Sequence, residues 1–193
     1  MGASGLSQIY GDAAEKVRGV DIVNVMTLRF GNIEIDEDRV IEMPDGMLGF
    51  TDRRFIIISP DRYGQFFWLQ SLDNPELAFV VTDPALFVQG YEVNLTPDEY
   101  ERIKLSPDSE AIILAVVTMA PDVFDITLNL QGPIVVNHEK MLAKQIVLEE
   151  GKYATKHPLF ARGLSFSPLP PDDEVIPAPL PSLEKIATIC CNR

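Results

Sequence analysis

Alternation of apolar and polar residues is the feature that most constrains this chain. Between Asn24 and Leu148 the dominant period is two, which is the period of a half-buried β-strand and not of a helix. The strand candidates are rich in Val, Ile, Phe and Trp, and most are bounded by Gly, Pro, Asn or Asp. About nine short strands at this spacing are the pattern of an antiparallel barrel or sandwich. We therefore expect a mainly β protein, a single compact antiparallel β-barrel-like domain. The candidates cover residues 24–30, 33–35 with 39–43, 55–58, 65–70, 77–82, 111–119, 125–130, 134–136 and 144–148.

Helical signals are few and short. Thr96, Pro97 and Glu99 form a strong helix start, because threonine caps, proline suits the first helical position and Glu99 completes a capping box. This helix should run to about Leu105. Asp83 should cap a single-turn helix that begins at Pro84. The fold should thus carry one or two short helices, with a further weak helix at 12–18.

The prolines mark the end of the folded body. Six of the 15 lie between Pro168 and Pro181, and proline lacks the N–H that a helix or inner strand needs. We expect a weakly structured flank at 1–21, a barrel-like domain at 22–164 and an extended proline-rich tail at 165–193. Within that tail, residues 182–190 form either two helical turns capped by Ser182 or a frayed end.

Acidic charge is concentrated in the first two-thirds of the body. The chain has 16 Lys and Arg against 29 Asp and Glu, for a net charge of −13, and residues 22–125 alone hold 19 acidic and seven basic residues. Nucleic acid and anionic membranes need cationic side chains. The balance therefore argues against direct nucleic-acid binding and against a membrane, and it favours a basic protein partner.

Motifs for catalysis or for a cofactor are missing. The chain has no phosphate-binding glycine loop. His138 and His157 stand without the spacing of metal ligands, and the acidic run Asp36–Asp38 sits where a hairpin turn is expected and lacks the glycine and distal glutamate of a calcium loop. We therefore expect no enzyme, cofactor or metal. Without a secretory signal, a run of about 20 apolar residues or a disulfide framework, we expect a cytoplasmic protein.

Several residues do not fit a simple pattern of buried strands, because they are polar residues inside apolar runs or apolar residues in a loop. Gln70 and Ser71 either face a groove and bind a partner or satisfy backbone groups at the end of their strand. Asn129 should bond to backbone in a tight loop before Gly132 and Pro133. In the glycine-flanked loop 44–50, the apolar side chains either plug the end of a barrel or form an exposed contact patch. They are Met47, Leu48 and Phe50.

These same segments resemble the family of the bacterial flagellar assembly factor FliW. No single mark is specific, but their order and spacing over about residues 24–160 are. The marks are Phe30-Gly31 with Ile33, Pro44-x-Gly46-x-Leu48-Gly49-Phe50, Trp68-Leu69-Gln70-Ser71, Pro75-Glu76-Leu77-Ala78-Phe79, Asp83-Pro84 with Tyr91, Asn129-Leu130-x-Gly132-Pro133-Ile134-Val135-Val136-Asn137, Gln145 and Tyr153. Two departures stand out: the family often has alanine where Gly132 stands, and the tail after Leu164 is outside the family pattern.

The resemblance implies a small β-barrel-like fold without catalysis and two protein partners. Family members bind the carbon storage regulator CsrA, an RNA-binding protein, and relieve its repression of flagellin synthesis. They also bind flagellin itself, as a chaperone-like partner, and the two partners exclude each other in effect. Antagonism of CsrA works either by covering its RNA surface or, as the family favours, by binding beside that surface and repelling RNA.

Loop position and chemistry suggest which residues touch these partners. For the CsrA face we expect acidic or polar residues near strand ends. For an apolar contact we expect the loop residues Met47, Leu48 and Phe50, and Gln70 is a further candidate. Two other functions stay open: a small-molecule-binding β-barrel enzyme, and a scaffold that acts through its proline-rich tail. The candidates for the CsrA face are Asp73, Asn74, Glu76 and Asp83.

Overall fold

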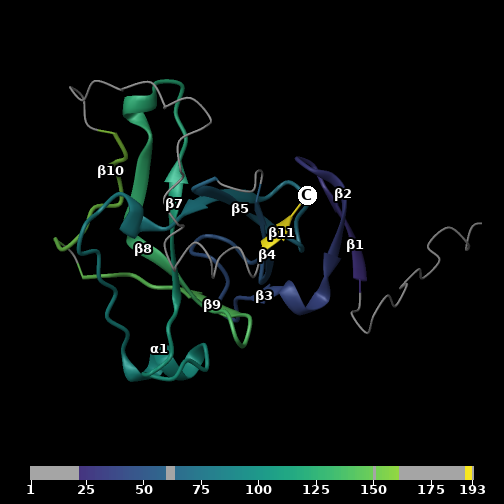
Figure 1. The fold of residues 1–193 in the computed structure, drawn as a ribbon, viewed down its shortest axis with the longest axis horizontal. Helices are drawn as coiled ribbons and strands as arrows, with labels where there is room; N and C mark the ends of the chain where they lie inside the picture. Colours follow the sequence, from purple (N-terminus) through teal and green to yellow (C-terminus); the bar gives the residue numbers. More distant parts are fainter. Residues whose placement is uncertain (1–21, 60–63, 150, 161–189, 193) are drawn as a thin grey trace, which may run out of the picture.

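The computed structural model describes residues 22–59, 64–149, 151–160 and 190–192 (Figure 1). The described residues are mainly β, with little helix. The strands are β1 (Ile22–Thr27), β2 (Gly31–Asp36), β3 (Ile41–Glu42), β4 (Arg54–Ser59), β5 (Phe66–Ser71), β6 (Ala78–Thr82), β7 (Ile112–Thr118), β8 (Thr127–Asn137), β9 (Leu142–Gln145), β10 (His157–Pro158) and β11 (Cys190–Asn192). The helices are α1 (Pro97–Arg102) and the 3-10 turns η1 (Glu37–Arg39), η2 (Pro84–Leu86) and η3 (Val123–Asp125).

Seven strands close into a barrel. Their order is β8-β7-β6-β5-β4-β3-β9, and β9 pairs back onto β8. All of these pairings are antiparallel except β3 with β9, so the predicted antiparallel β-barrel-like domain is confirmed. The interior is filled by apolar side chains from every barrel strand, which agrees with the alternation in the sequence. They include Ile41, Phe55, Ile57, Phe67, Leu69, Val81, Ile112, Leu114, Ile134, Val136 and Ala143.

A hairpin of β1 and β2 covers part of the outer wall, and it is drawn in purple beside β4 in Figure 1. Phe30 and Ile35 of this segment pack on Ile56 and Ile58, which point outward from β4. Trp68 of β5 joins the same cluster. Because this cluster buries the outward face of β4, both faces of that strand are removed from water, which explains its continuous apolar sequence.

A register shift divides the long ribbon of β7 and β8. Leu114 pairs with Ile134, but Val116 pairs with Asn129, so one residue of β7 lies opposite residues 130–133 of β8. The bulge changes which side chains point inward. In β8, Leu128 and Leu130 before the shift belong to a second apolar cluster, whereas Ile134 and Val136 after it fill the barrel.

Side chains and a neighbouring segment satisfy the backbone of this bulge. Asn129 Oδ1 accepts a hydrogen bond from the Gly132 N–H at 2.9 Å, and Gln145 Nε2 donates to the Gly132 carbonyl at 3.0 Å. Ile146 N–H donates to the Pro133 carbonyl at 2.8 Å. The predicted bond from Asn129 to backbone is confirmed, but the predicted loop between two strands is wrong. The strand continues because Gln145 and Ile146 replace the ladder partners that β7 no longer supplies.

The short helices begin where the sequence predicts. Thr96 and Glu99 form the capping box, with the Thr96 N–H 2.7 Å from Glu99 Oε2. Asp83 accepts from the Ala85 N–H at 2.8 Å and so caps η2. The α-helix ends at Arg102, earlier than predicted, and the predicted helix at 12–18 lies outside the described residues.

Two turns differ from the prediction. The first hairpin turns at residues 28–30, inside the strand predicted at 24–30, because the Thr27 hydroxyl accepts from the Phe30 N–H at 3.0 Å and donates to the Gly31 carbonyl. The acidic run after β2 forms η1, capped by Asp36, instead of a hairpin turn.

We predict that Asn129→Ala destabilises the fold by about 1–2 kcal/mol, because it leaves the Gly132 N–H of a buried bulge without its acceptor. Urea unfolding followed by Trp68 fluorescence measures this change. Asn24→Ala, at an exposed position of β1, is the control and should shift stability by less than about 0.5 kcal/mol. Equal effects of the two substitutions would contradict the role of Asn129.

Candidate functional site

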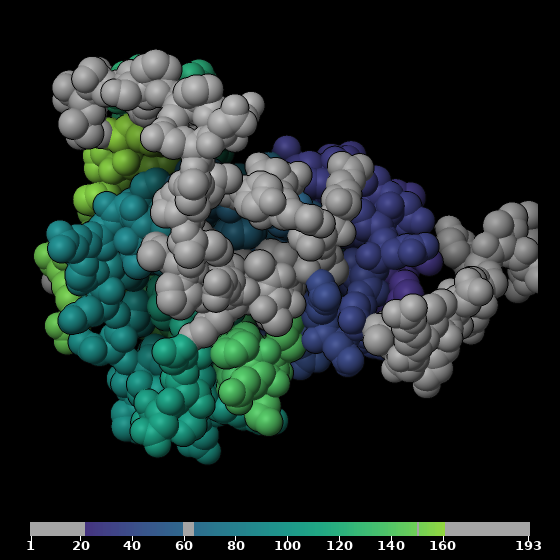
Figure 2. All heavy atoms as spheres, in the orientation of Figure 1, coloured from purple at the N-terminus to yellow at the C-terminus, as the bar shows by residue number. Residues whose placement is uncertain are grey.

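A hollow of about 830 Å³ opens where β3, the start of β4 and the β5–β6 turn meet. Three carboxylates and two arginines line it beside the apolar Met43 and Pro44, so its surface is mixed polar and apolar. The segment before β4 supplies one side and the turn at 72–77 the other. The lining residues are Glu42, Met43, Pro44, Thr51, Asp52, Arg53, Arg54, Asp73 and Asn74. Figure 2 shows that the N-terminal part of the described chain, purple to blue, gathers on one flank of the molecule.

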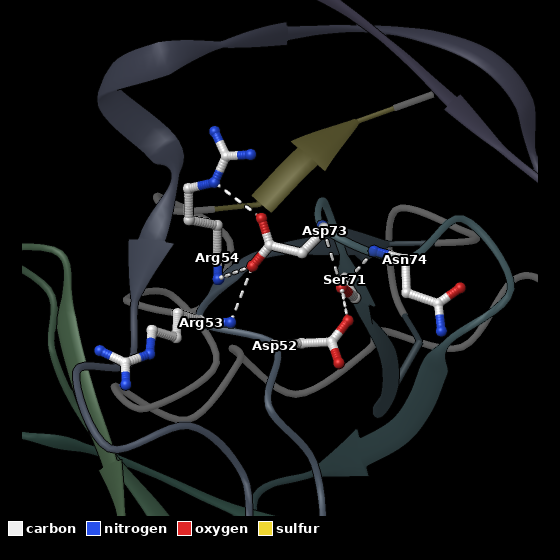
Figure 3. A network of polar contacts seen from close by, with 6 residues as sticks. All are labelled: Asp52, Arg53, Arg54, Ser71, Asp73 and Asn74. Atoms are coloured by element: carbon white, nitrogen blue, oxygen red, sulfur yellow. Dashed lines mark hydrogen bonds and ion pairs between the residues drawn. The ribbon is translucent and has the colours of Figure 1, made fainter.

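Asp73 fixes the β5–β6 turn to the start of β4 (Figure 3). Its Oδ2 accepts from the backbone N–H groups of Arg53 at 2.8 Å and Arg54 at 3.0 Å, and its Oδ1 accepts from Arg54 Nε at 2.8 Å. One carboxylate therefore satisfies two backbone donors and one guanidinium. Such charge-assisted bonds are stronger than neutral ones, so Asp73 is primarily a positioning residue.

Ser71 organises the turn itself. Its Oγ accepts from the N–H groups of Asp73 at 3.1 Å and Asn74 at 3.0 Å, and it donates to Asp52 Oδ1 at 2.6 Å. Asn74 Oδ1 accepts from the Glu76 N–H at 3.0 Å. The turn is thus defined by side chain to backbone bonds, as Ser and Asn commonly provide.

Gln70 links the two ends of the β5–β6 turn through its buried side chain. Its side chain is fully buried, and Nε2 donates to the carbonyls of Ser71 at 2.9 Å and Leu77 at 3.0 Å. The sequence left two roles open for Gln70, partner binding or hydrogen bonding to backbone groups at the end of its strand, and the structure shows the second. Gln70, named from the sequence as a candidate contact residue, is 0% exposed and lies inside the fold beneath the turn. Its Oε1 has no hydrogen-bond partner among the described residues.

The electrostatics of Asp73 follow from these contacts. Partial burial raises the pKa of its carboxyl, but the backbone N–H groups of Arg53 and Arg54 and the Arg54 guanidinium lower it more. The net pKa of Asp73 lies below its usual value. The carboxylate therefore stays charged through the whole range in which the protein would meet a partner.

The loop 44–50 is both a plug and an exposed patch. Met47 is 4% exposed and lies in the barrel core, whereas Leu48 is 59% and Phe50 42% exposed. Phe50 packs edge-on against Phe79 of β6, with ring centroids 5.1 Å apart. The loop therefore combines both placements considered from the sequence: Met47 plugs the barrel, and Leu48 and Phe50 are exposed.

Backbone and ion-pair contacts hold this loop in place. Gly46 has φ +71°, and a Cβ there would lie 3.0 Å from the Phe50 carbonyl oxygen, so only glycine fits without strain. Leu48 N–H donates to Gln145 Oε1 at 3.0 Å. Asp45 pairs with Arg102 of α1, and the hydrogen bond from Arg102 lowers the pKa of the Asp45 carboxyl.

The structure separates the candidates for the CsrA face. Asp73, Asn74 and Glu76 share the exposed β5–β6 turn. Asp83 does not belong with them, because it is 4% exposed and caps η2. Sequence reasoning missed Asp52 and Glu42, which the fold brings to the same hollow. No local pattern marks them, since each lies in a different segment.

Other kinds of site find no support in the described part of the chain. It contains no group of three or more His, Cys, Asp or Glu that could hold a metal ion. It also contains no helix long and apolar enough to cross a membrane. The closed barrel and its exposed segments define a small β-barrel protein. The polar β5–β6 turn (72–77) and the apolar loop 44–50 lie side by side at one end of the barrel, which we call the rim, and both are exposed there.

Comparison with known proteins places this barrel in a family. The FliW protein family model matches residues 24–159. The chain is 53% identical over 138 residues to the flagellar assembly factor FliW of Geobacter sulfurreducens, covering 72% of this chain and 87% of that protein. It is 54% identical to that of Geotalea uraniireducens, covering 72% and 85%. A crystal structure of the flagellar assembly factor FliW superposes with a TM-score of 0.67 at 32% identity, covering 74% of this chain and all of that one. The chain belongs to the FliW family of flagellar assembly factors.

We predict that Asp73→Ala lowers the free energy of unfolding by about 1–2 kcal/mol at pH 7, because two backbone donors lose a charged acceptor. Since the pKa of Asp73 is depressed in the fold, its contribution is present above the unfolded pKa of about 3.9 and is lost as pH falls through the lower folded value. The difference in free energy of unfolding between the parent and Asp73→Ala should therefore become smaller below about pH 4.

Urea unfolding from pH 7 to pH 3 measures this dependence. Asp108→Ala, in the exposed 106–109 turn, is the matched control and should change the stability by less than about 0.5 kcal/mol at every pH. A gap between Asp73→Ala and the parent that stays constant down to pH 3 would argue against the charged role of Asp73.

Proposed function

We propose that this chain acts in flagellum assembly by binding two proteins, CsrA and flagellin, and that it does so without catalysis. Binding of CsrA relieves repression of flagellin synthesis, and binding of flagellin makes the chain a chaperone-like partner. The flagellar role is supported by membership of the family, and the partners come from the resemblance in the sequence. The observation that carries the proposal is the fixed β5–β6 turn with exposed carboxylates beside an exposed apolar loop.

The polar side of the rim suits a basic partner. Residues 22–125 hold 19 acidic and seven basic residues, and an RNA-binding protein presents cationic side chains. Opposite fields steer such proteins together and raise the association rate. Glu76 is exposed at the tip of the turn, and among the described residues no cation pairs with its side chain. It is free to meet an incoming lysine or arginine.

The apolar side of the rim suits flagellin. Leu48 and Phe50 expose 59% and 42% of their surface next to Phe79. Flagellin's terminal segments are amphipathic and unpaired before assembly, and an amphipathic segment docks through its apolar face. Loop 44–50 therefore serves as the flagellin contact in this proposal.

The two surfaces adjoin, which supports mutual exclusion. Pro44 of the apolar loop and Asn74 of the polar turn line the same hollow. The Phe50–Phe79 contact also brings the loop against β6, which starts at Ala78, directly after the turn. Two protein partners of ordinary interface size, about 800 Å² each, would overlap there. A competition pull-down with both partners tests this: flagellin should release CsrA, and a stable ternary complex would refute exclusion.

We predict that Glu76→Lys weakens CsrA binding by about tenfold at low salt, since it reverses a charge in the proposed contact. Calorimetry at about 50 and 300 mM salt measures the effect, and both the affinity of the parent and the difference between variants should shrink at high salt. Glu101→Lys, at an exposed position of α1 and outside the β5–β6 turn, is the control and should bind like the parent. Salt-independent binding would count against the electrostatic part.

We predict that Leu48→Asp weakens flagellin binding by about tenfold and leaves CsrA binding within about twofold, because it puts a charge into an apolar contact. Fluorescence anisotropy with labelled flagellin measures the first effect. Met119→Asp is the control, since Met119, directly after β7, is 60% exposed, about as much as Leu48. Equal losses in the two variants would show that loop 44–50 is not the flagellin contact.

A further inference from the structure

The barrel wall is incomplete along β4. One edge of β4 pairs with β5 from Phe55 to Ile58. On the other edge β3 reaches only Arg54 and Phe55, because β3 is two residues long. Residues 57–59 of β4 therefore extend beyond the end of β3, and the strands of the barrel leave their backbone groups on that edge unpaired.

This edge lies in apolar surroundings. Phe55 and Ile57 face the barrel core, and Ile56 and Ile58 lie under the β1–β2 hairpin. All residues from Phe55 to Ser59 are buried. Backbone N–H and C=O groups in such surroundings need hydrogen-bond partners, and an unpaired strand edge is a template for another strand. The edge is thus suited to accept an extended segment.

The C-terminal strand β11 occupies this edge, and it appears in yellow beside β4 in Figure 1. It pairs in parallel, with Cys190 opposite Ile57, Cys191 opposite Ile58 and Asn192 opposite Ser59. From the sequence, residue 190 was expected in two helical turns or a frayed end; Cys190 lies in a strand, and residues 182–189 lie outside the described residues. β11 is an addition to the family barrel, since the family match ends at residue 159.

We infer that the Ile57–Ser59 edge of β4 is a binding site for an extended peptide strand and that the chain's own residues 190–192 are its resident occupant. A segment that binds there gains its affinity from main-chain hydrogen bonds. Apolar neighbours on both faces select uncharged residues, because a charge placed there would be desolvated. An extended, uncharged segment of a partner protein, lying parallel to β4, therefore competes with β11. This inference is independent of the CsrA and flagellin proposal.

Hydrogen exchange in the full chain tests the occupancy. In C190P/C191P the strand loses its N–H donors, and the amides of Ile57 and Ser59, which alternate with the β5-bonded Ile56 and Ile58 and so face β11, should exchange at least about tenfold faster. C190V/C191V removes the thiols but keeps the donors, so it should exchange like the parent. Unchanged exchange in the proline variant overturns the inference, as does equal acceleration in both variants. Protection of Leu114 and Val135, both fully buried, checks that the barrel remains folded.

A labelled peptide of residues 183–193, with valine in place of both cysteines, tests the site directly. It should bind C190P/C191P about tenfold more tightly than the parent, whose site is filled. A chain that ends at Pro181 is a second variant, should the prolines disturb folding, and it should bind as C190P/C191P does. Equal binding to all of these proteins, or binding to none, overturns the inference. A concentration-dependent dimer of the parent that the prolines abolish would assign β11 to a second copy and overturn occupancy within one chain.

Discussion

The side-chain amide of Gln145 is the contact on which the arrangement of this barrel depends. Its nitrogen donates to the Gly132 carbonyl inside the β8 bulge, and its oxygen accepts from the Leu48 N–H of loop 44–50. One side chain at the end of β9 therefore joins the bulge, the closing strand and the plug. The bulge turns the upper part of β7 and β8 toward a second apolar cluster, and the plug exposes Leu48 and Phe50. Space there is limited: a Cβ on residue 132 would lie 2.9 Å from Asn129 Nδ2, so an alanine in place of Gly132 would require that amide to move.

Polar residues near the rim fall into two groups: some fix the backbone of the turn, and others are exposed to a partner. The side chains of Gln70, Ser71 and Asp73 form hydrogen bonds with backbone groups of the β5–β6 turn and of the start of β4. This division leaves Glu76 exposed on a turn of fixed shape, with the apolar loop at its side. A binding surface whose shape is set before the partner arrives loses less entropy on association. The proposed exclusion between CsrA and flagellin needs only that these neighbouring surfaces be too close for two partners.

The edge of β4 is completed by a strand that lies outside the family match, which ends at residue 159. Where β3 stops short, a segment from the far end of the chain completes the wall. The same physical requirement, a partner for every buried backbone group, explains β11 at the edge and Ile146 and Gln145 at the bulge. In the proposed exchange, a partner strand replaces β11 and the pairings among the seven barrel strands stay intact, because β11 is not one of those strands.

The period-two pattern, the capping box at Thr96 and Glu99 and the Asp83 cap were all readable from the sequence, because each depends on residues a few positions apart. The ordered marks also identified the family. Only the tertiary structure decided that β8 is one bulged strand, that Gln70 and Asp83 are buried, and that Asp52 and Glu42 share a hollow with Asp73. The reason is separation along the chain: Leu48 and Gln145 lie 97 positions apart, and no local pattern encodes which distant partner a polar group will meet.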